Sequence, residues 1–174
     1  MSQLGKEQAE NLALALKEEK LSAIYSSPLQ RALDTARTIA RYHDLVEVRV
    51  EPELREFEVG ELEGVLASTL SSDFGQFLVQ CNNGDCTKKM PGGESLVDLQ
   101  QRSWTIVQHI AAQHEGTVAL VSHYFVTLTI ICAALGLPPG GITRFRVSVG
   151  SMSTLDFRHG YPCLTSLGDT CHLV

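Results

Sequence analysis

Apolar and polar residues fall along the chain in blocks that predict strands and helices in turn. The clearest block is Thr117–Pro138, TVALVSHYFVTLTIICAALGLP. Its unbroken apolar run Val118–Val121 predicts a short strand buried on both faces, as in a parallel sheet. The longer apolar run that follows predicts a helix ending at Gly136, a typical stop residue. His123 stands between the two, where an open α/β sheet binds ligands, although a histidine that merely ends the strand is the alternative.

The same patterns predict elements over the rest of the chain. Strands that alternate with helices indicate a single α/β domain, 1–174, with a largely parallel sheet. The stretch 65–91 is the least patterned and is interpreted as an insertion with one helix near 74–80. The other predicted elements are helices at 2–17, 26–41 and 95–113 and strands at 21–26, 46–50, 151–157 and 162–167, the last two forming a hairpin.

Composition narrows the class of protein. The 174 residues are 44% hydrophobic and 20% charged, an ordinary globular balance that allows a sizeable core. The net charge of −6 argues against a nucleic-acid partner or an anionic membrane surface. No apolar run is long enough to span a bilayer, and no signal-peptide pattern follows Met1. We therefore expect a cytoplasmic protein.

The five cysteines do not form a recognisable framework. Their number is odd and none lies in a CxxC motif, so free thiols in a reducing compartment are expected. A metal site built from Cys81, Cys86, Cys171 and His172 is the alternative, but no paired short spacing supports it.

Arg31 is the second residue whose position suggests chemistry. Ser26-Ser27-Pro28 predicts a helix start with a serine cap and proline in the first turn, so Arg31 falls in the first turn of a helix that follows a strand. Backbone N–H groups favour an anion at such a place, and a guanidinium adds bidentate recognition of an oxyanion. A solvated arginine is the alternative.

Four segments, in this order and spacing, resemble the histidine phosphatase superfamily, whose fold is phosphoglycerate mutase-like. They are SSPLQRALDTA (26–36), LREFEVGELEG (54–64), GGESLVDLQQR (92–102) and ALVSHYFVTLTIICAALGLP (119–138). The resemblance covers nearly the whole chain. It implies a three-layer α/β/α fold around a mostly parallel sheet.

The resemblance also implies roles for three residues. Arg31 matches the arginine that holds the phosphoryl oxygens, His123 the second histidine of the phosphate pocket, and Glu56 the carboxyl group that donates a proton to the leaving group. Phosphoryl transfer needs fixed positive charge and such a proton. No metal or cofactor is implied, and the expected partner is a small phosphorylated metabolite such as a sugar phosphate, a phosphoglycerate or a nucleotide-like phosphate.

One element of the family pattern is missing. The nucleophilic histidine of the family lies in an Arg-His-Gly motif after the first strand, whereas this chain resembles the family only from the first helix onward. Arg158-His159-Gly160 spells the motif in a late turn, which we interpret as coincidence because a motif counts only in its structural context. Two hypotheses follow: the chain is a fragment of an active phosphatase, or it is a pseudoenzyme that binds a phosphorylated ligand or a partner. In both cases we expect the 174-residue chain itself to be inactive.

Two structural expectations follow from the resemblance. The family's first strand lies inside the sheet, so its absence would leave unpaired backbone groups on two neighbouring strands. We expect the gap to be closed by re-pairing, by water or by another chain, for example in a homodimer. Tyr124 and Phe125 also replace the small residues usual after the second histidine, and they either shape the pocket or pack beneath the sheet edge.

Overall fold

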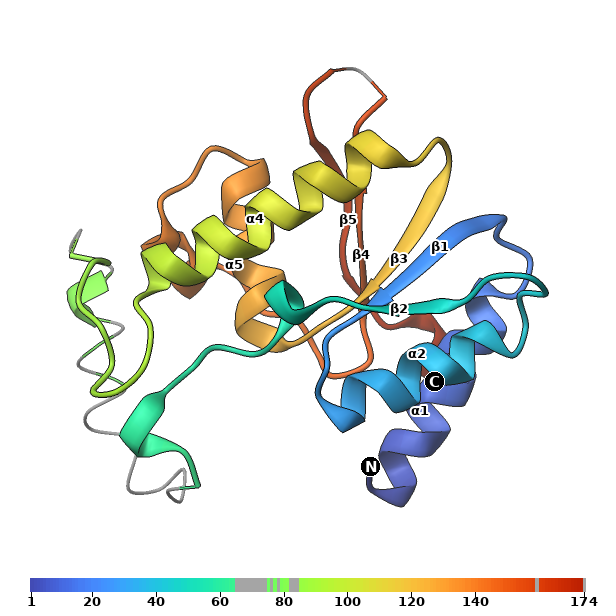
Figure 1. The fold of residues 1–174 in the computed structure, drawn as a ribbon, viewed down its shortest axis with the longest axis horizontal. Coiled ribbons are helices and arrows are strands. Elements are labelled where there is room, and N and C mark those ends of the chain that lie inside the picture. The colour runs from blue at the N-terminus through green and yellow to red at the C-terminus, as the bar shows by residue number, and fades with distance from the viewer. Residues whose placement is uncertain (65–74, 76, 78, 82–84, 159, 174) are drawn as a thin grey trace.

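The computed structural model describes residues 1–64, 75, 77, 79–81, 85–158 and 160–173. Helices and strands follow one another in the order that the sequence pattern predicts (Figure 1). They are α1 (Gln3–Leu16), β1 (Leu21–Ser26), α2 (Gln30–Ala40), β2 (Val48–Val50), α4 (Leu96–Gln113), β3 (Thr117–Val121), α5 (Tyr124–Ala134), β4 (Met152–Asp156) and β5 (Cys163–Asp169). Short 3-10 turns lie at η1 (Pro52–Leu54), η2 (Gly60–Leu62), η3 (Pro139–Arg144) and η4 (Cys171–Leu173).

The central sheet is parallel, as predicted. Its strand order is β2-β1-β3, with Ser26 of β1 opposite Val50 of β2 on one side and Val121 of β3 on the other. The carboxyl ends of the three strands therefore meet at one edge. β4 and β5 form a separate antiparallel hairpin, which confirms the predicted strand pair.

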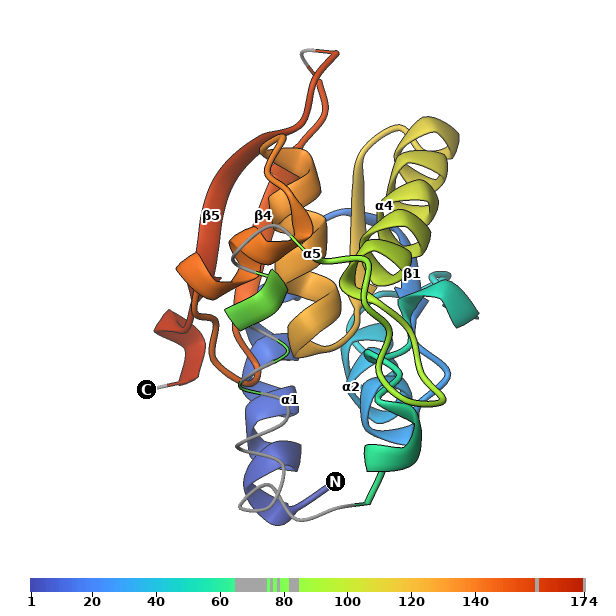
Figure 2. The same cartoon turned by 90° about the vertical axis from the view of Figure 1, so that its left-hand side faces the viewer.

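Helices cover both faces of the central sheet (Figure 2). Ile24 of β1 packs with residues of α1 and α2, while its neighbours Ala23 and Tyr25 belong to the cluster that includes α4 and α5. This alternation follows from the pleat, which turns successive side chains to opposite faces. The result is the expected three-layer α/β/α fold.

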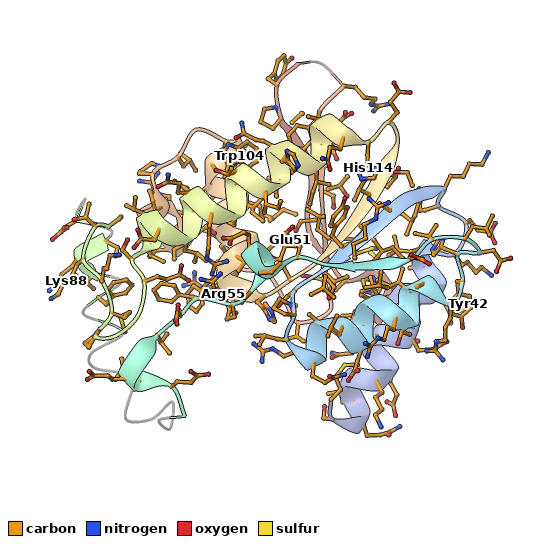
Figure 3. All side chains as sticks on the ribbon, viewed as in Figure 1. Tyr42, Glu51, Arg55, Lys88, Trp104 and His114 are labelled. Carbon is orange, nitrogen blue, oxygen red and sulfur yellow. The ribbon has the colours of Figure 1, made fainter. Side chains whose placement is uncertain are left out.

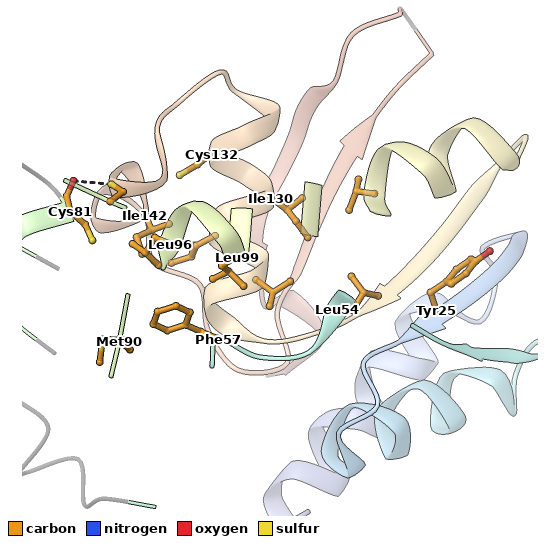
Figure 4. Packing of buried hydrophobic residues seen from close by; sticks show 14 of the residues in the cluster. Tyr25, Leu54, Phe57, Cys81, Met90, Leu96, Leu99, Ile130, Cys132 and Ile142 are labelled. Atoms are coloured by element: carbon orange, nitrogen blue, oxygen red, sulfur yellow. Dashed lines mark hydrogen bonds between the residues drawn. The ribbon is translucent and has the colours of Figure 1, made fainter. Parts of the chain in front are cut away.

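The larger of the two apolar clusters also contains the segment after β2. Phe57 of that segment lies near Leu96 and Leu99 of α4 in Figure 4. Both leucines are fully buried, and Phe57 is 5% exposed. The same cluster contains Cys81 and Cys86, and the thiol of Cys86 donates to the Cys81 carbonyl oxygen. Apolar packing thus fixes the segment that carries Glu56.

Local chemistry explains where the two long helices of this layer begin and end. Ser95 and Asp98 form a capping box at the start of α4, as the sequence predicts. Hydrogen bonds from Ser95 lower the pKa of Asp98 to about 2. α5 is apolar on nearly all sides because it is a buried helix, and it stops before Gly136, whose φ of +67° suits glycine.

One prediction about the central strand is wrong. Val118–Val121 was expected to be buried on both faces, yet each of its residues is only partly buried. β3 pairs with β1 alone, and among the described residues no strand lies against its other edge. β4 does not re-pair with β3, so the side chains of β3 lack the neighbours that an interior strand has.

The predicted helix near 74–80 falls partly on residues outside the described set; residues 75, 77 and 79–81 are helical. His159 is also outside it. Trp104 stacks on Phe157, in keeping with a packing role (Figure 3 labels Trp104 on α4). All five cysteines are free thiols, and none of the described helices has the length and apolar character needed to cross a bilayer.

Candidate active site

Two strand ends bring the predicted site residues together. Ser27 directly follows β1, and His123 lies two residues beyond the end of β3, where Ser26 and Val121 are paired. The His123 ring is 8% exposed, and its Nε2 lies 2.7 Å from the Ser27 hydroxyl. Arg31, in the first turn of α2, donates from Nε to Nδ1 of His123 across 3.2 Å. The sheet edge thus holds an imidazole between a hydroxyl group and a guanidinium.

These hydrogen bonds define the protonation state of His123. Arg31 only donates, so Nδ1 must be the unprotonated acceptor and the ring proton sits on Nε2, pointing at Ser27. Burial, followed by the charges of Arg31 and Arg102 as smaller causes, lowers the pKa of His123 from its ordinary value of 6.5 to about 4. The imidazole is therefore neutral near pH 7.

Ser27 is a site residue that the sequence reasoning misassigned. It was expected among the serines that cap α2, but α2 begins at Gln30 and Leu29 is its cap residue, without a side-chain bond. The Ser27 hydroxyl accepts the Leu29 N–H instead and faces His123. Its side chain is completely buried. The serine at the strand end was visible in the sequence; its pairing with a residue 96 positions away was not.

Glu56, the third predicted site residue, lies at the same sheet edge, near Arg31 and the first turn of α5. Its carboxyl group accepts the N–H of Phe57 at 2.8 Å and also interacts with the N–H of Phe125 in the first turn of α5. Burial raises the pKa of Glu56; the two N–H groups and the charge of Arg31 counteract this only in part. The environment thus favours retention of a proton on the carboxyl group.

The structure therefore gathers Arg31, His123 and Glu56 around one point of the sheet edge. Arg31 bonds to His123 directly and acts electrostatically on Glu56. The combination offers a fixed cation, a neutral imidazole and a carboxylic acid that can donate a proton. Such a set binds an oxyanion and protonates an oxygen that departs from it.

A buried ion pair holds the Glu56 segment in place. Arg102 of α4 and Glu94 are 10% and 9% exposed at their side chains, and they form two hydrogen bonds of 2.7 and 2.9 Å. Arg102 also donates to the carbonyl oxygens of Glu53, Arg55 and Glu56. Figure 3 shows Arg55 on this segment beside α4. Sequence reasoning assigned the pair no role, because neither residue carries a recognisable catalytic signature.

Close backbone contact with residues 91–94 also fixes the segment that carries Glu56. Glu94 N–H donates to the Glu58 carbonyl oxygen and Glu58 N–H to the Glu94 carboxylate, both across 3.0 Å. A Cβ atom on Gly60 would lie 2.1 Å from the Pro91 carbonyl oxygen, and one on Gly93 would lie 2.2 Å from that of Glu58. Because any larger side chain would clash at either position, both glycines are needed for the close packing of these two loops.

An open hollow of about 710 Å³ has Arg102 and Glu94 in its lining. Its charged residues neutralise one another: Arg55 lies near Glu53 and Glu58, and Lys89 pairs with Asp98. Neither Arg31 nor His123 lines it. The three predicted site residues therefore gather at the sheet edge rather than in this hollow.

No described group of three or more His, Cys, Asp or Glu side chains is arranged to hold a metal ion. The four residues considered as ligands are divided: Cys81 and Cys86 are buried in the core, whereas Cys171 is exposed in η4 and His172 bonds to the Gly150 carbonyl oxygen.

Comparison with known proteins identifies the family. Residues 1–170 match the model of the histidine phosphatase superfamily (branch 1). Phosphoserine phosphatase 1 of Hydrogenobacter thermophilus is 30% identical, over 99% of this chain and 82% of that protein. A probable phosphoglycerate mutase of Yersinia enterocolitica is 31% identical, over 99% and 83%. A phosphoserine phosphatase from Entamoeba histolytica, solved with 3-phosphoglyceric acid, is 28% identical with a TM-score of 0.84, over all of this chain and 86% of that one. The chain therefore belongs to the histidine phosphatase superfamily.

Proposed function

We propose that this fold serves a phosphatase that hydrolyses a small phosphorylated metabolite, with the phosphoryl group bound at the Arg31–His123 pair. The observation that carries the proposal is the contact from Arg31 Nε to His123 Nδ1, with Glu56, whose pKa is raised by burial, within reach of the Arg31 charge. The similarity to phosphoserine phosphatases supports hydrolysis, while the similarity to a phosphoglycerate mutase makes intramolecular transfer the alternative.

The three residues divide the work in this proposal. Arg31 provides a permanent charge and hydrogen-bond donors for the phosphoryl oxygens. His123 donates from Nε2, which in the ligand-free chain points at Ser27. The negative charge of a bound phosphoryl group favours the imidazolium form, in which Nδ1 carries a proton and no longer accepts from Arg31. Glu56 donates its proton to the leaving oxygen as the P–O bond breaks.

The nucleophile is a separate question. The family resemblance implies a phosphohistidine intermediate. Among the described histidines, His43, His109, His114 and His172 have no contact with the Arg31–His123 pair. We propose that the 174 residues bind phosphate esters but turn them over slowly or not at all. A pseudoenzyme that binds a phosphorylated ligand has the same binding site.

Calorimetric titration of inorganic phosphate into the whole chain tests the site. Arg31→Ala and His123→Ala should each reduce the affinity strongly, whereas Arg37→Ala, which removes an exposed arginine from the same helix, should not. Unchanged affinity in the first two variants would contradict the proposal.

A turnover assay with a generic aryl phosphate separates the two roles. We expect little or no activity in the 174-residue chain, since covalent phosphoryl transfer depends on its nucleophile. Robust activity that His159→Ala abolishes would show that Arg158-His159-Gly160 is functional after all.

A further inference from the structure

A small hollow lies next to the site, between α5 and the segment from η3 onward. Its volume is about 230 Å³. α5 and the turn that follows it lie side by side in Figure 2. The lining residues are Tyr124, Phe125, Leu128, Ile142, Thr143 and Arg146.

The position of this hollow relates it to the leaving group. Tyr124 directly follows His123, and the N–H of Phe125 interacts with the Glu56 carboxyl group. A leaving oxygen that takes its proton from Glu56 must therefore lie close to the first turn of α5. Tyr124 and Phe125 lie in that turn and also form one wall of the hollow.

The lining of the hollow combines apolar side chains with the hydroxyl groups of Tyr124 and Thr143, and Arg146 is its one charged residue. Leu128 and Ile142 are buried, and the Tyr124 ring stands edge-on against Phe125 at 5.1 Å. Arg146 donates from Nη1 to the carbonyl oxygens of Thr143 and Phe145, at 3.1 and 2.8 Å. In the part of the chain that the structure describes, no carboxylate lies within ion-pair distance of Arg146. A guanidinium that is held in place by carbonyl groups, with no counter-charge, is suited to an anionic ligand.

We infer that this hollow is the leaving-group subsite and that Arg146 selects substrates whose leaving group carries a carboxylate. The inference rests on the proposed function, since it needs the phosphoryl group at Arg31 and His123. The volume is below the roughly 300–1,000 Å³ of ordinary ligand pockets, which favours a compact hydroxy acid over a nucleoside. Phe125 has its own place in the core against Phe57, whereas the 38% exposed ring of Tyr124 forms the rim of the subsite.

Three ligands titrated into the whole chain test the inference. 3-Phosphoglycerate carries a carboxylate, glycerol 3-phosphate has the same carbon skeleton without one, and inorganic phosphate has no leaving group. Arg146→Gln should weaken binding of 3-phosphoglycerate about 10- to 100-fold, the usual value of a charge-assisted hydrogen bond. It should leave the other two ligands within about twofold, and Arg146→Lys should lose less. Arg144→Gln is the matched control: Arg144 is exposed, lies two residues away and does not line the hollow.

The outcomes separate this inference from the proposed function. If Arg146→Gln binds 3-phosphoglycerate as tightly as the unchanged chain does, or if it loses affinity for both esters equally, the assignment of the subsite is wrong while the phosphate site stands. Equal affinity of the unchanged chain for the two esters would also overturn it. If Arg31→Ala retains all phosphate binding, or the unchanged chain binds none of the three ligands, the proposed function itself fails.

Discussion

Arg31 donates a hydrogen bond from Nε to Nδ1 of His123, and these residues come from different elements, 92 positions apart in the sequence. The bond places a permanent cation against an imidazole that burial keeps neutral. A positive charge next to an unprotonated ring is stable without a ligand. Because a bound anion would favour the protonated ring, we expect anion binding at this pair to be accompanied by the uptake of a proton.

The titration of His123 tests this relationship. In the free protein we expect its ring to titrate near pH 4, because burial and the Arg31 charge both oppose the imidazolium form. Arg31→Gln should raise the pKa of His123 only part of the way to 6.5, because burial is the larger cause. Saturating phosphate should raise it further in the unchanged chain. NMR of the imidazole carbon-bound protons measures all three values.

His109 serves as the internal control for these spectra, because it is exposed on α4 and, among the described residues, bonds only to Gln113. Its resonances at a fixed pH should be the same in the unchanged chain and in Arg31→Gln. A His123 ring that titrates above pH 6 in the ligand-free chain would contradict the assigned hydrogen bonds.

The same group makes stability depend on pH. Between about pH 4 and 6.5, His123 is protonated in the unfolded chain but neutral in the folded one. The free energy of unfolding should therefore rise with pH in this window and level off above it. Glu56 acts in the opposite direction: its raised pKa gives stability that is present in acid and lost as pH rises through the folded value. Urea denaturation from pH 4 to 8 should show a flatter acid limb in His123→Gln. An identical limb in that variant would assign the dependence to other groups.

Substitutions at Gly60 and Gly64 distinguish the cost of a strained backbone from the cost of a steric clash in the segment that carries Glu56. Both have positive φ, +58° and +80°, but they differ in their surroundings. Gly60 packs against the Pro91–Gly93 backbone, whereas no atom of the described residues lies within 4 Å of a Cβ on Gly64. Gly64→Ala should cost roughly 1–2 kcal/mol, the usual penalty for a left-handed alanine. Gly60→Ala should cost clearly more and should also weaken phosphate binding, because the loop that carries Glu56 must move. Equal losses of stability in the two variants would mean that the close approach to Pro91 is unimportant.

Local patterns were sufficient to predict most of the elements. Ser95 and Asp98 predicted the start of α4, Gly136 predicted the end of α5, and the apolar run after Thr117 predicted β3. These features depend on residues a few positions apart. The position of His123 at a sheet edge followed from the same local argument.

Contacts between distant segments were beyond local patterns. The burial of β3 was overestimated because its apolar run does not reveal how many strands flank it. The bonding of Ser27 to His123 and of Arg102 to Glu94 and three carbonyl groups depends on packing that no spacing in the sequence expresses. The individual site residues were thus predictable, but the groups that hold them were not.

The free edge of β3 predicts self-association. The Ser27 N–H donates to the Val121 carbonyl oxygen, so Val121 faces β1 and the backbone groups of Val118 and Leu120 face the edge that no described strand covers. An uncovered, apolar strand edge is a template for another chain. Light scattering should show dimers or larger species that grow with protein concentration. A monomer that persists at high concentration would exclude pairing between chains and leave water as the cover.

Arg102 and Glu94 should matter more to stability than any exposed ion pair. Arg102→Lys keeps the charge but cannot reach Glu94 and three carbonyl groups at once, and Arg102→Met leaves Glu94 buried and unpaired. Removing one partner of a buried pair costs about 3–5 kcal/mol, so Arg102→Met should lower the free energy of unfolding by about that amount. Arg41→Lys, at the exposed pair with Glu10, should change it by less than about 1 kcal/mol. If Arg102→Lys, which should stay folded, binds phosphate less tightly while Arg41→Lys does not, then Arg102 acts on the site by positioning the Glu56 segment. Loss of stability in Arg102→Lys with no change in phosphate affinity would restrict the pair to folding.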